Sequence, residues 1–184
     1  VGKRAPHIVG ASLGGLGVIV GAGILEPSAF ASVTLVDITP NMEAGGVAKI
    51  IGFMGEHSAD GFASLDEAAD VIAQYMPYRP RPQDLEGLRK NLRQGPDSRW
   101  RWHWDPAFIQ GVMRRSAIER VGDLEQSVRD IKVPIHLVRG RMSELVSDAS
   151  VEAFKALAPH AHYTDVAGAR HMVAGDKNDI FTTA

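Results

Sequence analysis

The sequence predicts an α/β fold with a partial parallel sheet and a helical insertion, on three observations. A strand, a Gly-rich turn with a helix, and a second strand follow one another over residues 5–38. Helical periodicity with Pro-rich breaks fills residues 45–127, and strand-like segments return after residue 132. Strand–helix–strand units at this spacing form parallel pairs with right-handed crossovers. We therefore expect a core of residues 1–44 and 128–184, and a helical cap over residues 45–127.

The core elements are identified by β-branched apolar runs and by helical periodicity. The expected strands cover residues 5–9, 32–38, 133–139 and 161–166, and the expected helices cover residues 13–25, 150–157 and 178–182. In the cap, Ser64 and Glu67 resemble a capping box that opens a helix through about Tyr75. Further cap helices are expected at residues 83–92, 106–115 and 124–130, and no strand is expected there.

Composition excludes several classes of function. The 184 residues carry a formal net charge of −2 and no cysteine, so disulfides, thiolate chemistry and Cys-ligated metals are excluded. The small net charge predicts neither nucleic acid nor a membrane as a partner. His160 and His162 lack the carboxylates that a metal site would need, and we expect no metal or cofactor. The absence of a secretory signal predicts a cytoplasmic protein.

The turn around Ser12 carries the clearest functional signal. Gly10-Ala-Ser12-Leu-Gly14 has the Gly-x-Ser-x-Gly form of a nucleophile elbow between a strand and a helix. Such a turn strains the serine backbone, exposes its hydroxyl, and directs the N–H of the next residue, Leu13, toward a developing oxyanion. A serine nucleophile needs a histidine base and a carboxylate. His171, in a loop after the last expected strand, is the best placed of the seven histidines.

Four segments resemble the α/β-hydrolase superfamily, in particular its capped esterases, lactonases and cofactor-free peroxidases. They are residues 10–15, 35–40, 138–146 and 168–176. The resemblance implies a serine hydrolase with Ser12 as nucleophile, His171 as base and a small-molecule ester or lactone as substrate, with perhydrolysis as a side activity. It also implies an acid near the end of the third strand or of the second. We favour Glu144 in the first position, with Asp37 in the second as the alternative.

The sequence departs from the family pattern in two ways. Family members often carry the acid three residues after the glycine that ends the penultimate strand, where this sequence has Ser143. The family also takes its second oxyanion donor from a loop upstream of the elbow. The chain starts at Val1, almost directly at the elbow strand, so we expect a missing N-terminal segment to supply that donor and to cover an exposed sheet edge. A homodimer is compatible with the sequence.

The substrate-binding residues are expected in the cap and beside the base. Trp102 and Trp104 recur with Trp100 at every second residue, which favours an aromatic wall. His103 lies between them, and Met172 follows the base. The alternative interpretation of these three tryptophans is that they pack the cap.

Two other functions are compatible with the sequence. Gly10-x-Ser12-x-x-Gly15 imitates the dinucleotide-binding fingerprint, and Asp37 would then bind a ribose, although the middle glycine is a serine. A hydrolase fold can also act as a catalytically inactive ligand receptor.

Overall fold

The computed structural model describes residues 5–109 and 123–183. The described residues separate into two compact units. The first contains residues 5–47 and 123–183, and the second contains residues 48–109.

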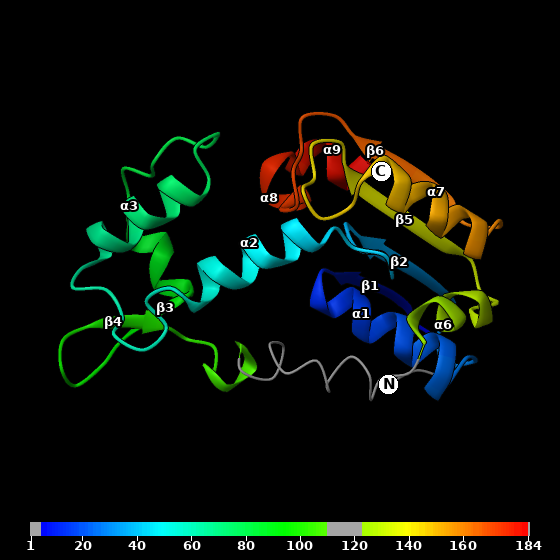
Figure 1. The fold of residues 1–184 in the computed structure, drawn as a ribbon, viewed down its shortest axis with the longest axis horizontal. Coiled ribbons are helices and arrows are strands. Elements are labelled where there is room, and N and C mark those ends of the chain that lie inside the picture. Colours follow the sequence, from blue (N-terminus) through cyan, green and yellow to red (C-terminus); the bar gives the residue numbers. More distant parts are fainter. Residues whose placement is uncertain (1–4, 110–122, 184) are drawn as a thin grey trace. The chain divides into compact units, whose positions relative to one another are not determined.

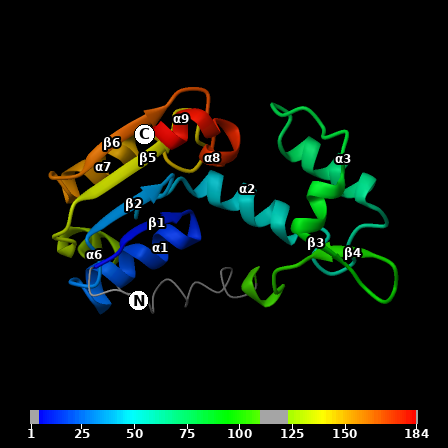
Figure 2. The same ribbon diagram turned by 180° about the vertical axis from the view of Figure 1, so that it is seen from behind.

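A four-stranded parallel sheet forms the centre of the first unit (Figure 1). Its strands are β1 (His7–Ala11), β2 (Ser32–Val36), β5 (Ile135–Gly140) and β6 (His162–Val166). They lie side by side in that order, and each neighbouring pair is parallel (Figure 2). The expected partial parallel sheet is thereby confirmed. Because the strands are parallel, the loops that follow all four of them meet at one edge of the sheet.

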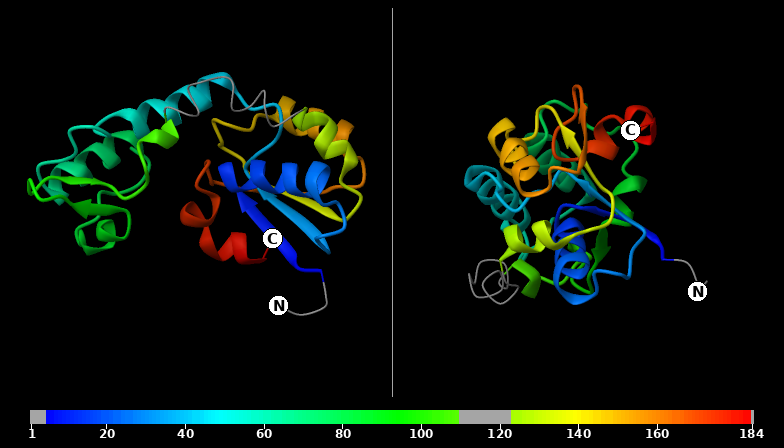
Figure 3. Two further views of the ribbon diagram at one scale, coloured as in Figure 1. Left: turned by 90° about the horizontal axis from the view of Figure 1, so that it is seen from below. Right: turned by 90° about the vertical axis from the view of Figure 1, so that its right-hand side faces the viewer.

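Helices cover both faces of this sheet. One face carries α1 (Leu13–Val20), α6 (Leu124–Asp130) and α7 (Asp148–Leu157), whereas α8 (Val173–Asp176) and α9 (Asn178–Thr183) lie on the other (Figure 3). Right-handed crossovers between successive parallel strands bring α1, α6 and α7 to the same side. The expected cap boundary at residue 127 falls inside α6, all of which belongs to the first unit.

The core is apolar on both faces of the strands. Val33, Leu35, Ile135 and Leu137 are at most 1% exposed. On the face of α8 and α9, the strand valines pack with the residues that follow β6; this cluster consists of Val36, Val138, Val166, Ala169 and Val173, with Phe181 against it. Burial on both faces explains why these strands are recognisable as nearly continuous apolar runs.

The helix expected over residues 13–25 changes character before its end. Regular α1 stops at Val20, and a π-helical turn spans Gly21–Leu25. A Cβ at Gly23 would lie 2.2 Å from the backbone oxygen of Ser127 in α6. The glycine therefore allows two helix backbones to approach closely, which positions α1 on the sheet.

Strand β1 has one edge that pairs with no strand of residues 5–109 and 123–183. Among the described residues it hydrogen-bonds only with β2, and it stands at the end of the sheet. Val9, in the middle of β1, is 63% exposed although its type favours burial. An unprotected apolar edge of this kind is a template for another strand.

The second unit contains most of α2 (Ala44–Gly55), with α3 (Leu65–Tyr75), the 3₁₀ turn η2 (Glu86–Lys90) and an antiparallel pair of β3 (Leu92–Gln94) and β4 (Trp100–Trp102). The β3–β4 pair corrects the expectation that residues 45–127 hold no strand. Three-residue strands are too short to produce a period-two pattern. The helix expected at 83–92 is only the η2 turn, and most of the one expected at 106–115 lies outside the described residues.

The start of α3 confirms the capping box. The Ser64 hydroxyl accepts a hydrogen bond from the Glu67 N–H at 3.1 Å, and the Glu67 carboxylate accepts one from the Ala63 N–H. One unpaired donor of the first helical turn is thereby satisfied, and the Glu67 carboxylate reaches back to the residue before the N-cap. The helix ends at Tyr75, as expected.

Candidate active site

Ser12 occupies a sharp turn between β1 and α1. Its backbone has φ 50° and ψ −122°, a region that residues other than glycine rarely adopt. The turn is held because the Ser12 N–H donates to the Val36 oxygen at 3.2 Å. The Ser12 backbone carbonyl oxygen in turn accepts from the Gly15 and Leu16 N–H groups at 2.9 and 3.2 Å. A strained serine fixed in this way is the expected geometry of a nucleophile elbow.

The glycines around Ser12 have different roles. A Cβ at Gly10 would lie 2.7 Å from the Gly14 oxygen, and a Cβ at Gly15 would lie 2.3 Å from the Ile38 Cγ2 atom. A Cβ at Gly14 would meet nothing within 4 Å. The close packing of the turn on the sheet therefore depends on Gly10 and Gly15. The spacing alone had suggested Gly10 and Gly14.

His171 lies against Ser12 from the loop after β6. Its Nε2 atom is 3.1 Å from the Ser12 Oγ atom, and its side chain is 13% exposed. This loop is fixed next to the base, since the Arg170 N–H donates to Asp176 Oδ2 at 2.9 Å. Gly140, at the end of β5, also packs on the loop: a Cβ there would be 2.2 Å from the Arg170 oxygen.

Asp37 is the carboxylate that contacts His171. The residue follows β2, is completely buried, and has a positive φ of 50°. Its Oδ2 atom is 2.8 Å from His171 Nδ1. An ionised carboxylate can only accept, so Nδ1 carries the proton and Nε2 of the neutral ring accepts from the Ser12 hydroxyl. The three side chains thus form one chain of hydrogen bonds that runs from Ser12 through His171 to Asp37. Along the sequence they occur in the order serine, aspartate, histidine.

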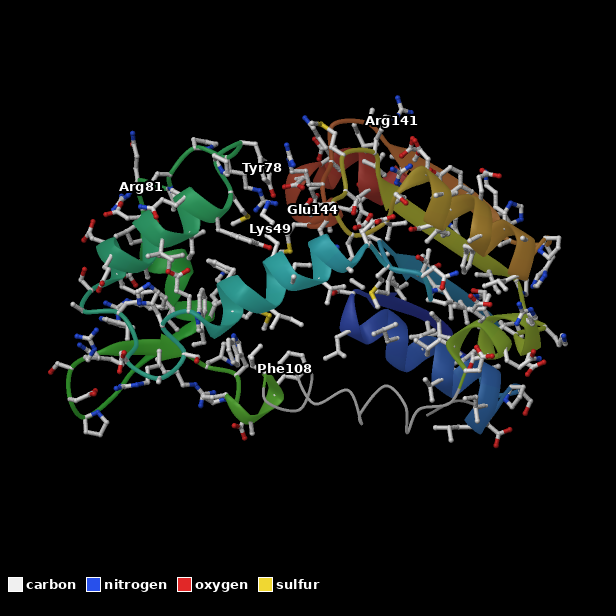
Figure 4. All side chains as sticks on the ribbon, in the orientation of Figure 1. Lys49, Tyr78, Arg81, Phe108, Arg141 and Glu144 are labelled. Atoms are coloured by element: carbon white, nitrogen blue, oxygen red, sulfur yellow. The ribbon has the colours of Figure 1, made fainter. Side chains whose placement is uncertain are left out.

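Glu144, the residue favoured from the sequence, does not occupy this position. It lies on the loop between β5 and α7, as does Arg141 (Figure 4). The residue of that loop that faces the site is Ser143, whose hydroxyl donates to Asp37 Oδ2 at 2.6 Å. Both ring nitrogens of His171 are occupied, by Ser12 and Asp37. The carboxylate that contacts His171 is thus not on the loop after β5; it belongs to Asp37, which follows the neighbouring strand β2.

The start of α1 offers a donor for an oxyanion. The Leu13 N–H has no hydrogen-bond acceptor among residues 5–109 and 123–183, whereas the N–H groups of Gly15 and Leu16 donate to the Ser12 carbonyl oxygen. The first N–H groups of a helix have no partner within the helix, and they give its N-terminal end a partial positive charge. Leu13 is therefore available to polarise a carbonyl bound to Ser12.

The other expected binding residues are distributed over both units. Met172 follows His171 in the first unit, and its side chain is 52% exposed. Trp102 and Trp104 lie in the second unit with stacked rings, 6.4 Å apart, and Trp102 also packs edge-on against Phe62. The His103 N–H donates to the Asn91 oxygen at 3.0 Å. A role of these cap residues in binding substrate stays a prediction.

Two further features of the described residues concern ligands, and a third concerns membranes. A hollow of about 300 Å³ lies within the second unit, between α2 and α3, and contains none of the three triad side chains. Within residues 5–109 and 123–183, no group of three or more His, Asp or Glu side chains could hold a metal ion. No helix in these ranges is both long and apolar enough to cross a membrane.

Solved structures with this arrangement of strands and helices are numerous. An E-2-(acetamidomethylene)succinate hydrolase aligns with a TM-score of 0.81 and 24% identity over 98% of this chain. An α/β hydrolase from Novosphingobium aromaticivorans aligns with a TM-score of 0.75 and 19% identity over 96%. The chain has the α/β-hydrolase fold. An esterase from Mycobacterium tuberculosis with the same arrangement aligns with a TM-score of 0.68 and 24% identity over 97%.

The α/β-hydrolase structures are longer than this chain, which spans 65%, 63% and 58% of the three proteins in that order. No family model matches the sequence, and no curated protein is significantly similar to it. The α/β-hydrolase fold excludes the dinucleotide-binding alternative, and so does the site. Asp37, which would bind the ribose, is buried and has both carboxylate oxygens occupied.

Proposed function

We propose that this protein is a serine hydrolase that cleaves a carboxylic ester or lactone through an acyl-enzyme. The observation that supports this most directly is the hydrogen-bonded chain Ser12–His171–Asp37, with distances of 3.1 and 2.8 Å. Structural relatives that are hydrolases and esterases agree with it. Such a chain raises the nucleophilicity of a serine hydroxyl, because the imidazole takes the proton as the new bond forms.

The reaction follows from these positions. Ser12 Oγ attacks the carbonyl carbon, and its proton passes to His171 Nε2. The carbonyl oxygen becomes an oxyanion next to the Leu13 N–H. His171 then protonates the leaving alkoxide as the ester bond breaks. A water molecule gives its proton to the same nitrogen, attacks the acyl carbon, and releases the acid, so that Ser12 regains its proton. Asp37 keeps its charge throughout and stabilises the imidazolium.

The substrate's acyl part is expected to be apolar. Leu13 and Met172 directly follow the nucleophile and the base, and their side chains are 55% and 52% exposed. Large apolar side chains exposed next to reacting groups are a typical lining for an acyl group.

A further segment is expected to complete this site. The unpaired edge of β1 can accept another strand, and the structural relatives contain additional chain. We expect a segment of the same protein to pair with β1 and to bring a second oxyanion donor; a second copy of the chain is the alternative occupant. In the full-length protein, the amides of β1 should then exchange slowly with deuterium while the protein is monomeric. Fast exchange would contradict this, and protection only in a dimer would favour the second copy.

A fluorophosphonate probe tests the proposed function. It should label the full-length protein at Ser12, and Ser12→Ala should abolish both the labelling and the hydrolysis of short p-nitrophenyl esters. Ser28→Ala is a matched control, since Ser28 is exposed in a loop and its hydroxyl donates to Glu26 Oε1 at 2.8 Å, away from the site. Absence of labelling in the wild type would favour an inactive ligand receptor. Labelling at another serine would refute Ser12 as the nucleophile.

A further inference from the structure

Three donors hold the buried carboxylate of Asp37. Its Oδ1 atom accepts from the Gly140 N–H at 3.0 Å. Its Oδ2 atom accepts from His171 Nδ1 at 2.8 Å and from the Ser143 hydroxyl at 2.6 Å. The base and Ser143 therefore share one oxygen. The orientation of that oxygen determines how well the carboxylate is aligned with the imidazole.

The Ser143 hydroxyl can point in only one direction. Its oxygen accepts from the Leu145 and Val146 N–H groups at 3.0 and 3.1 Å. Because both acceptor sites of the hydroxyl are used, its single proton remains for Asp37. A hydroxyl bonded to a charged partner in a buried position is a strong and directional contact.

The loop that carries Ser143 is itself anchored on several sides. The Met142 N–H donates to the Ala169 oxygen at 2.9 Å, and the Glu43 N–H donates to the Leu145 oxygen at 2.9 Å. The buried Arg139 donates through Nε to the Val146 oxygen at 2.8 Å. These bonds tie the loop to the segments after β2 and β6, which carry Asp37 and His171. Ser143 thus presents its hydroxyl from a fixed support.

We propose that Ser143 is a positioning residue that fixes the rotation of the Asp37 carboxylate, so that Oδ2 stays aligned with His171 Nδ1. This inference rests on the proposed function for its kinetic consequences, and on hydrogen-bond geometry alone for its structural ones. Without the hydroxyl, Oδ2 keeps one donor, and the carboxylate is free to turn about its Cβ–Cγ bond. The imidazole is then less well oriented for proton transfer from Ser12.

The kinetic test compares Ser143→Ala with Ser143→Thr in the full-length protein. A charge-assisted hydrogen bond corresponds to about a 10- to 100-fold effect, so Ser143→Ala should lower kcat by about that factor and change KM less than about 2-fold. Ser143→Thr retains the hydroxyl and should recover most of kcat. Ser147→Ala is the matched control: it removes a hydroxyl that accepts from the Ser150 N–H at 3.1 Å and caps α7. It should lower the melting temperature and leave kcat unchanged.

The same substitution in an Asp37→Asn background separates positioning from a general effect on the loop. If Ser143 acts through Asp37, Ser143→Ala should change the remaining fluorophosphonate labelling rate of Asp37→Asn by less than about 2-fold. An equal loss in both backgrounds, or no loss in the wild-type background, would overturn the proposal.

A measurement that needs no activity distinguishes failure of this inference from failure of the proposed function. The His171 Nδ1 proton, bonded to a buried carboxylate, should give a downfield proton resonance in NMR spectra. In Ser143→Ala this resonance should shift or broaden, and in Ser143→Thr it should return. An unchanged resonance in Ser143→Ala would overturn the positioning role, whereas a wild type with the resonance but no labelling would overturn only the hydrolase.

Discussion

The two carboxylates that compete for the role of triad acid can be separated by one pair of isosteric substitutions. In Asp37→Asn the side chain keeps its shape, and its remaining oxygen can still accept from the Gly140 N–H. The new amide nitrogen then replaces Oδ2, 2.8 Å from His171 Nδ1 and 2.6 Å from the Ser143 hydroxyl. A donor in that place favours the tautomer with the proton on Nε2, which cannot accept the proton of Ser12.

The expected loss follows from the burial of Asp37. Because Asp37 is 0% exposed, no water can replace the lost acceptor. The corresponding Asp-to-Asn change in a serine protease triad lowers kcat about 10⁴-fold, and we expect a loss of the same size here. At about 1.36 kcal/mol per factor of ten, this is about 5.4 kcal/mol of transition-state stabilisation. Glu144→Gln makes the same change of charge and shape on the loop after β5, and its kcat should stay within about 3-fold of the wild type.

The assay is the hydrolysis of p-nitrophenyl butyrate by the full-length protein, with the rate of fluorophosphonate labelling as a second measure. Thermal unfolding of each variant establishes that it is folded at the assay temperature. A loss above about 100-fold in Glu144→Gln, together with a loss below about 10-fold in Asp37→Asn, would refute the assignment of the acid from the hydrogen-bond geometry.

Three further predictions concern stability, each measured by thermal or urea unfolding. Gly15→Ala should lower the free energy of unfolding by at least about 1–3 kcal/mol, since its Cβ would lie 2.3 Å from a buried side-chain methyl. Gly14→Ala, whose Cβ would meet nothing within 4 Å, should be neutral or stabilising by up to about 1 kcal/mol. The reverse order of stabilities would contradict the steric argument. Ser64→Ala should cost about 1 kcal/mol through the lost cap of α3, and an unchanged midpoint would speak against that cap. Burial, helped by the neighbouring histidine on β6, lowers the pKa of His136 below its usual 6.5, so the unfolded chain binds a proton more readily. Stability should therefore decrease as the pH falls from about 6.5 toward the folded pKa, and His136→Gln should reduce that slope; an equal slope in both proteins would contradict it.

Much of the core could be predicted from the sequence because its signals are local. Strands β1, β2 and β5 contain β-branched apolar runs, and the capping residues Ser64 and Glu67 lie three positions apart. The β3–β4 pair was missed because three-residue strands leave no measurable periodicity. The π-helical turn after Val20 has no local signal in the sequence, and the close approach of α6 at Gly23 involves a segment that is remote in sequence.

The residues of the site also differ in whether a local sequence signal identifies them. Ser12 could be selected from its own neighbours, because the backbone of a nucleophile elbow needs a local pattern of small residues. His171 could be selected from its place in a loop after the last strand. The choice between two carboxylates could not be made in this way, since either one follows a strand whose end lies at the same edge of the sheet.

The sequence by itself determined the order of strands and helices in the first unit, the strained serine turn and the histidine that follows β6, since each of these depends on residues close together in the chain. Only the tertiary structure decided that Asp37 contacts His171 and that Ser143 contacts Asp37. These pairs are 134 and 106 residues apart, and their contact depends on the register of neighbouring parallel strands and on the anchoring of the loops after them. The direction of a side chain at a strand end is set by that packing, and a shift of one residue along a loop turns it elsewhere.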